Sequence, residues 1–160
     1  MSALTLAFEN PGQQDIRGLL SASNAYMAAL YPAESNHMTG IDALTAPNVR
    51  FLVARLDGVC VGCGALILAD DGSAEIKRMW VEPEARGLKL GCRLLHAIEA
   101  EAGKYGIVML RLETGILQPE AISLYRSEGF SEIEAFGSYM PDPLSVFMEK
   151  RLAENGPQDL

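Results

Sequence analysis

The stretch from Arg86 to Gly91 carries the residue types that hold phosphate groups in proteins. It reads Arg-Gly-Leu-Lys-Leu-Gly, follows an apolar run and a proline turn, and opens into an amphipathic helical pattern. The first N–H groups of a helix have no partner inside the helix, and the positive end of the helix dipole lies beside them. The pattern therefore predicts a site for a phosphate or pyrophosphate.

Both charged side chains and backbone amides are expected to take part in this site. The residues concerned are Arg86 and Lys89 by their charge, and Gly87, Leu88, Leu90, Gly91 and Cys92 by their amides. The alternative interpretation is a plain helix start with flanking charges. The order of strand, loop and helix favours phosphate binding, because a glycine-rich loop signals little without that context.

The elements that must position the loop follow from hydrophobic periodicity and from turn residues. Before the loop, a strand, a long helix and a short helix are expected at Leu4–Phe8, Asp15–Leu30 and Ile41–Leu44. The dipeptide Asp57-Gly58 predicts a hairpin between two further strands. Three strands in a row then lead to the loop, at Val49–Leu56, Val59–Leu68 and Ala74–Val81.

After the loop, helices and strands alternate before the chain ends in two strands. A helix is expected to run from the loop to Lys104, with Gly106 beyond its end. A strand, a helix and two strands follow at Val108–Thr114, Pro119–Glu128, Phe130–Phe136 and Leu144–Leu152. The order β-α-α-β-β-β-α-β-α-β-β predicts an α/β fold, a mixed sheet of about seven strands with helices on both faces. We expect a single domain over residues 1–153 and a polar tail over 154–160.

Composition and charge limit the partners. The chain has 160 residues and a formal net charge of −8, which argues against a nucleic acid or an anionic membrane and suits a neutral or cationic substrate. No apolar run reaches the roughly 20 residues of a membrane span, and the first residues do not resemble a signal peptide. With three cysteines, an odd number, we expect a soluble cytoplasmic protein with reduced thiols.

The cysteines do not predict a metal site. Cys60 and Cys63 have the spacing of a zinc-binding pair, but a tetrahedral site needs further ligands and none follows at matching spacing. Both are expected to be small core thiols, and Cys92 receives no catalytic role. Of the two histidines, His96 is expected at the surface of its helix.

A second motif joins the loop in a resemblance to a known family. Gln118-Pro-Glu-Ala-Ile-Ser-Leu-Tyr125, followed by Gly129-Phe130, is similar to the Asn-x-x-Ala-x-x-Leu-Tyr...Gly-Phe signature of the GCN5-related N-acetyltransferases (GNAT), with Gln in place of Asn. The loop resembles the family's Arg/Gln-x-x-Gly-x-Gly/Ala pattern, with Lys89 where the middle Gly is usual. The segment from Phe136 to Lys150 looks like a loosely characterised bacterial subgroup of that family.

The resemblance implies an N-acetyltransferase with a GNAT-like acyl-CoA N-acyltransferase fold. It implies acetyl-CoA as co-substrate, no metal, and direct attack by a primary amine, either a small molecule or a peptide, in a ternary complex. The strands Ala74–Val81 and Val108–Thr114 would part to admit the pantetheine arm. Met79, Trp80, Val81 and Gln118 would join the loop in binding the co-substrate. Backbone groups of Met79 and Val81 would hold its amides and polarise the thioester carbonyl, while the Trp80 side chain should point to the opposite face, into the core.

The same resemblance implies a general acid and a general base. Tyr125 would protonate the leaving thiolate; the alternative is a core tyrosine. Glu75 would deprotonate the amine through water, and in a regular strand it would share a face with Lys77 and Met79. Alternatively, Glu75 is a solvated strand residue paired with Lys77 or Arg78. Apart from the resemblance, the candidates for lining the acceptor pocket are His37, Glu113, Thr114 and Tyr139, because polar loops at the mouth of a sheet often carry specificity; the alternative for His37 is an ordinary loop residue.

Two other functions stay open at this stage. A non-catalytic sensor that binds acetyl-CoA would account for the replaced Gly and Asn of the two motifs. A nucleotide-binding domain would use the same loop for ATP, but the chain lacks a Gly-x-x-x-x-Gly-Lys-Ser/Thr loop. The resemblance also suggests a homodimer formed through the C-terminal strands.

Overall fold

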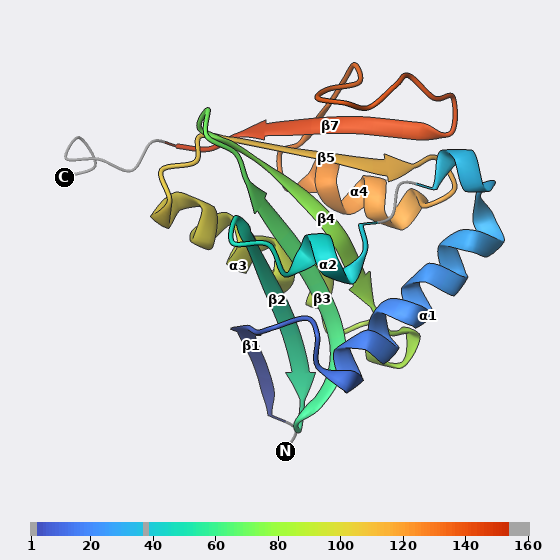
Figure 1. Ribbon diagram of the computed structural model, residues 1–160, viewed down its shortest axis with the longest axis vertical. Coiled ribbons are helices and arrows are strands. Elements are labelled where there is room, and N and C mark those ends of the chain that lie inside the picture. Colours follow the sequence, from blue (N-terminus) through green and yellow to red (C-terminus); the bar gives the residue numbers. More distant parts are fainter. Residues whose placement is uncertain (1–2, 37–38, 154–160) are drawn as a thin grey trace.

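Seven strands form one twisted sheet in the computed structural model, which describes residues 3–36 and 39–153. In space the strand order is β1-β2-β3-β4-β5-β7-β6, and every neighbouring pair is antiparallel except β4 and β5 (Figure 1). The strands are β1 (Leu4–Phe8), β2 (Val49–Leu56), β3 (Val59–Leu68), β4 (Ser73–Val81), β5 (Met109–Gly115), β6 (Ser131–Ile133) and β7 (Ser145–Arg151).

Helices cover both faces of the sheet. On one face, α1 (Gln14–Leu30) and α2 (Ile41–Leu44) pack over β2 and β3 through a cluster that includes Ile16, Leu44 and Phe51. On the other face lie α3 (Leu90–Lys104) and α4 (Pro119–Ser127), and the larger core cluster forms there around Leu94 and Ile98. Two short 3₁₀ helices, Ala33–Ser35 and Pro83–Ala85, lead into the loops beside the site.

The predicted element order and the mixed α/β architecture are confirmed. Most boundaries fall within a residue or two of the expected ones, because Gly and Pro mark them. The strand expected over Phe130–Phe136 is shorter, since only Ser131–Ile133 pairs with β7. The ring of Phe136 instead packs edge-on against Phe147, with the centroids 5.9 Å apart. None of the described helices is long and apolar enough to cross a lipid bilayer.

An irregularity in β4 decides which side chains face which helices. Cys63 pairs with Trp80 and Ala65 with Lys77, so that Arg78 and Met79 together oppose the single residue Gly64. Arg78 has a φ of 61°, and this pair of residues forms a β-bulge. Gly64 leaves room for the side chains on this face, because a Cβ at its position would lie 2.6 Å from Met79 Sδ and 2.9 Å from Ile98 Cδ1.

The bulge corrects one sequence-based expectation. Glu75 and Lys77 do share a face, but Met79 lies on the other one and packs against the α3 cluster. Arg78 points toward α1, where its Nη1 donates a hydrogen bond to Asn24 Oδ1 at 2.7 Å. Beyond the bulge, Trp80 is buried in the α1 cluster, opposite to Met79, as expected.

Candidate functional site

β4 and β5 separate before either strand ends. Their ladder begins at the pair Ser73 and Met109 and stops at Ile76 and Leu112, although β4 continues to Val81 and β5 to Gly115. Figure 1 shows the two strands starting side by side and diverging toward their carboxyl ends. An extended ligand can pair with a strand edge exposed in this way.

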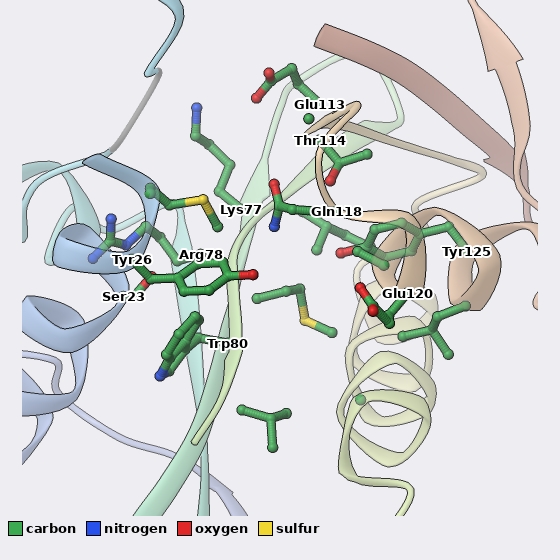
Figure 2. A pocket seen from close by; sticks show the side chains of 18 of the residues that line it. Ser23, Tyr26, Lys77, Arg78, Trp80, Glu113, Thr114, Gln118, Glu120 and Tyr125 are labelled. Atoms are coloured by element: carbon green, nitrogen blue, oxygen red, sulfur yellow. The ribbon is translucent and has the colours of Figure 1, made fainter. Parts of the chain in front are cut away.

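A cavity of about 520 Å³ fills the gap between the two strands. Side chains of α1 and β4, including Tyr26 and Trp80, line one wall, and those of β5 and α4, including Gln118 and Tyr125, line the other (Figure 2). Arg86 and Gly91 of the predicted phosphate loop also line it. The cavity therefore joins the loop to the parting strands, as the resemblance implied.

The loop leads from the 3₁₀ helix directly into α3. Gly87 has a φ of 98°, and α3 begins at Leu90. Within the described ranges, the N–H groups from Gly87 to Cys92 donate to no protein acceptor. The guanidinium of Arg86 lies 5.6 Å from the centre of the Trp80 ring, at the cavity wall. These donors and this charge form the kind of helix start at which anions bind.

Lys89 takes the left-handed backbone conformation that precedes α3, with a φ of 57°. This conformation costs an L-residue roughly 1–2 kcal/mol, whereas glycine adopts it freely. The usual glycine of the loop pattern thus has a backbone reason, and this chain accepts the strain while gaining a positive charge at the loop.

Tyr125 on α4 is buried, and Figure 2 shows its hydroxyl directed toward the cavity. Its ring packs edge-on against Phe130, with the centroids 5.6 Å apart. Within the part of the chain that is described, the hydroxyl has no hydrogen-bond partner. Burial raises its pKa above the ordinary value of 10, so that the phenol is protonated at neutral pH and can donate to a ligand.

Tyr31, which sequence reasoning missed, closes the end of the cavity between α1 and α4. Its hydroxyl accepts a hydrogen bond from the Leu117 N–H at 3.0 Å and donates one to Gln118 Oε1 at 3.3 Å. Gly115 leaves room for it, because a Cβ there would lie 1.9 Å from the Tyr31 hydroxyl. A contact between residues 86 apart leaves no local signal in the sequence.

Glu75, Lys77 and Tyr139 form a hydrogen-bonded group beside the main cavity. The Tyr139 hydroxyl donates to Glu75 Oε2 at 2.5 Å and accepts from Lys77 Nζ at 2.7 Å. Burial and the Glu75 carboxylate raise the pKa of Tyr139 above its ordinary value. Tyr139 and Lys77 line the main cavity, whereas Glu75 lines a neighbouring hollow of about 490 Å³ with them.

The other predicted residues divide into two sets. Those that line the main cavity are Met79, Trp80, Val81, Arg86, Gly91, Glu113, Thr114, Gln118, Tyr125 and Tyr139. The rest of the loop, Gly87, Leu88, Lys89, Leu90 and Cys92, lies at the start of α3 rather than in the lining. His37 lies outside the described residues. Besides Tyr31, sequence reasoning also missed Ser23 and Tyr26 on α1, which no local motif marks.

Comparison with known proteins shows which protein family the chain resembles. A family model described as an acetyltransferase (GNAT) domain matches residues 47–132. The chain is 48% identical over 153 residues to an IAA acetyltransferase of Azospirillum brasilense, covering 95% of this chain and 100% of that protein. It is 38% identical to the uncharacterized N-acetyltransferase YsnE of Bacillus subtilis, with coverages of 79% and 85%.

Solved structures agree with these relatives. A Klebsiella pneumoniae protein described as an acyl-CoA N-acyltransferase superimposes with a TM-score of 0.81 at 38% identity, covering 94% of this chain and 98% of that one. An N-acetyltransferase of Thermoplasma acidophilum, solved in complex with coenzyme A, shares the fold with a TM-score of 0.72 at 20% identity, covering 93% and 99%.

Proposed function

The chain belongs to the GNAT family and is an acetyl-CoA-dependent N-acetyltransferase, and from that premise we propose that a primary amine attacks the thioester directly in a ternary complex. The observation that carries the proposal is the meeting of the parted strands, the Arg86 loop and Tyr125 at one cavity. Reactants held side by side there gain much of the acceleration from proximity and orientation alone.

The pantetheine arm of acetyl-CoA would take the place of a strand between β4 and β5. Backbone groups of Met79 and Val81, beyond the last β4–β5 pair, would bind its amides and polarise the thioester carbonyl. The diphosphate would accept hydrogen bonds from the amides between Gly87 and Cys92, with the charges of Arg86 and Lys89 beside it. Gln118, at the start of α4, would complete the site.

Tyr125 would act as the general acid that protonates the departing thiolate. Burial raises the pKa of its phenol, which by itself would weaken the acid. The thiolate forms in the same apolar surroundings, however, and desolvation raises the pKa of its conjugate thiol as well. The two groups therefore remain matched closely enough for proton transfer.

Glu75 would act as the general base through Tyr139 rather than by direct contact with the amine. Tyr139 lines the cavity and donates its proton to Glu75 at 2.5 Å. The Tyr139 oxygen can take a proton from the incoming ammonium group while its own proton passes to the carboxylate. Lys77, 2.7 Å from the same oxygen, stabilises negative charge on it during the transfer.

The acceptor would be a cationic or neutral amine with an aromatic or apolar part. Glu113 supplies a carboxylate to the cavity, and Tyr26 and Trp80, with ring centroids 5.3 Å apart, supply aromatic surface on the α1 side. The A. brasilense relative is named an IAA acetyltransferase. IAA therefore belongs in the acceptor panel beside simple amines, amino acids and peptides.

The proposal is tested by release of free CoA thiol across that panel, with Tyr125→Phe beside the wild type. We expect the rate of the variant to fall about 10²-fold or more, with nearly unchanged affinity for acetyl-CoA. The matched control is Tyr105→Phe, since Tyr105 is exposed at the end of α3. An unchanged rate in Tyr125→Phe would exclude this tyrosine as the acid.

Initial-rate kinetics test the ternary complex. Double-reciprocal plots against both substrates should intersect, whereas parallel lines would indicate a covalent acetyl-enzyme. If acetyl-CoA binds tightly and no amine of the panel releases CoA, the catalytic proposal fails. That result would support the alternative of an acetyl-CoA sensor.

A further inference from the structure

Cys92, His96 and Glu128 bring three different metal-binding side chains together outside the cavity. Cys92 and His96 stand four residues apart on α3 and therefore share a face. Glu128 caps the C-terminal end of α4 and reaches the same place from the neighbouring helix. A sulfur, a ring nitrogen and a carboxylate oxygen of these residues all lie within 4.8 Å of one another.

The two separations that involve the sulfur match the edges of a tetrahedral zinc site. Zinc binds sulfur at about 2.3 Å and nitrogen or oxygen at about 2.0–2.2 Å, so that tetrahedral angles place sulfur about 3.6 Å from either of the other ligand atoms. Cys92 Sγ lies 3.5 Å from His96 Nε2 and 3.6 Å from Glu128 Oε2. His96 Nε2 also contacts Glu128 Oε1 in a short hydrogen bond, which a metal ion would replace.

The same contacts argue against a nucleophilic cysteine. In a catalytic triad the carboxylate binds the ring nitrogen that faces away from the nucleophile, whereas Glu128 contacts His96 Nε2, the nitrogen nearer to Cys92 Sγ. A metal ion can still bind this thiol, because it takes the thiolate in place of the proton.

We propose that Cys92, His96 and Glu128 bind one zinc ion on the outer side of α3 and α4, with a fourth position open to water. The proposal replaces the expectation, drawn from the sequence, of a protein without metal. His96 has 58% of its side chain exposed, so that the ion can enter from solvent. The ligands are of the kinds that favour zinc over magnesium or calcium.

The ion would cross-link α3 and α4, the two helices that border the cavity. α3 and α4 already approach closely, since a Cβ at Gly91 would lie 3.1 Å from Leu124 Cδ2. Cys92 is also the last residue of the predicted diphosphate loop. Zinc would therefore stabilise the fold and hold the loop amides in place.

Metal titration of chelator-treated, tag-free protein tests this without any measurement of acetyl transfer. We expect one Zn²⁺ to bind per chain and to raise the melting temperature, and Co²⁺ to produce a thiolate charge-transfer absorption band. Cys92→Ser, His96→Gln and Glu128→Gln should each weaken Zn²⁺ binding about tenfold or more, and Cys92→Ser should abolish the band. Melting curves of the metal-free variants establish that each one folds.

Cys60→Ser and Glu132→Gln are the matched controls, because neither residue belongs to the cluster. Both should bind Zn²⁺ as the wild type does. The proposal is overturned if the wild type binds no Zn²⁺, or if the three ligand variants retain its affinity. Neither result would bear on the acetyl-CoA site, since its test depends on CoA release.

Discussion

Tyr125 and Tyr139 line one cavity but have different surroundings, and this difference separates their proposed roles. Tyr125 has no hydrogen-bond partner in the part of the chain that the structure describes and is free to donate toward a leaving group. Tyr139 is held between Glu75 and Lys77, at 2.5 and 2.7 Å. Such a hydroxyl is suited to pass a proton on, because it already has both an acceptor and a donor.

A double-mutant cycle tests whether Glu75 and Tyr139 act as one relay. We expect Glu75→Gln and Tyr139→Phe each to lower the turnover rate about 10²-fold. The combined variant should cost little more than either single change, because each one interrupts the same path. The measurement is the turnover rate of all three variants with a saturating amine.

Additive losses in that cycle would show that the two residues act independently. If Glu75→Gln keeps the wild-type rate while Tyr139→Phe loses it, Tyr139 positions the acceptor and Glu75 is the paired surface carboxylate of the alternative interpretation. If a variant is slow because it lacks the general base, raising the pH should restore its turnover rate, since more of the amine is then neutral. A lost positioning contact is not restored in this way.

At the scale of elements, the C-terminal end of α1 is fitted against the turn between β5 and α4. The Tyr31 hydroxyl forms this contact through hydrogen bonds with the Leu117 N–H and the Gln118 side chain. Gly115 leaves room for that hydroxyl. This wall of the cavity thus depends on a helix that precedes it by more than 80 residues. Substitutions at the contact should affect stability and acceptor binding together.

Gly115→Ala should destabilise the fold by about 1–3 kcal/mol, because its methyl group overlaps the Tyr31 hydroxyl. The added Tyr31→Ala change removes the overlapping group, so that the double variant should be more stable than the sum of the single effects predicts. Urea unfolding of the four proteins measures this coupling. Strict additivity would mean that the two residues do not meet in solution.

A partly exposed ion cluster ties the first strand to the sheet and to α1. Arg55 on β2 contacts Glu9, which follows β1, at 2.9 Å and Asp15 on α1 at 2.6 Å. The Arg55 guanidinium lowers the pKa of Glu9 below the ordinary value of 4.5 and also lowers that of Asp15. Carboxylates with lowered folded-state pKa values stabilise the fold above their unfolded-state values and lose that effect as the pH falls.

The stability of the wild type should therefore decline as the pH drops from 4.5 through the lowered pKa of Glu9. Arg55→Gln should be less stable at neutral pH and should lose less over that acid range, because its carboxylates titrate at ordinary values in both states. The urea midpoint, followed from neutral to acid pH, provides the measurement. Parallel curves for the two proteins would exclude this cluster as a source of acid sensitivity.

At the scale of the whole molecule, the sequence predicted most of the elements but not how the site is shaped. Asp57-Gly58, Gly106 and Pro119 mark turns or helix ends through local backbone preferences, which a sequence exposes. The bulge at Arg78 is different, since a lysine or arginine in a strand gives no sign of a positive φ. It lies where Arg78 and Met79 together oppose Gly64 on the neighbouring strand, and it places Met79 on the opposite face from Glu75.

Contacts between elements that lie far apart in the chain could not be predicted from the sequence either. The helical spacing of Cys92 and His96 was readable, but their third partner, Glu128, lies 32 residues beyond His96 on another helix. Tyr31 likewise reaches the site only because α1 crosses the sheet. The loop and α4 motifs could be found because each one lies within a single short stretch.

Binding of acetyl-CoA should stabilise the whole molecule. At a ligand concentration of about 100 times the dissociation constant, the free energy of unfolding should rise by about 2.7 kcal/mol. For a chain of this size that corresponds to an increase of about 5–10 °C in melting temperature. Arg86→Ala should reduce the shift, and the absence of any shift in the wild type would rule out the proposed co-substrate site.

The early separation of β4 and β5 has a consequence for the protein before it meets its co-substrate. The interior of its sheet contains two bare strand edges, which most sheets have only at their margins. Such edges attract strands from other chains. We therefore expect newly made protein to self-associate more readily when the thioester carrier is scarce, and its solubility during production to follow the supply of that carrier.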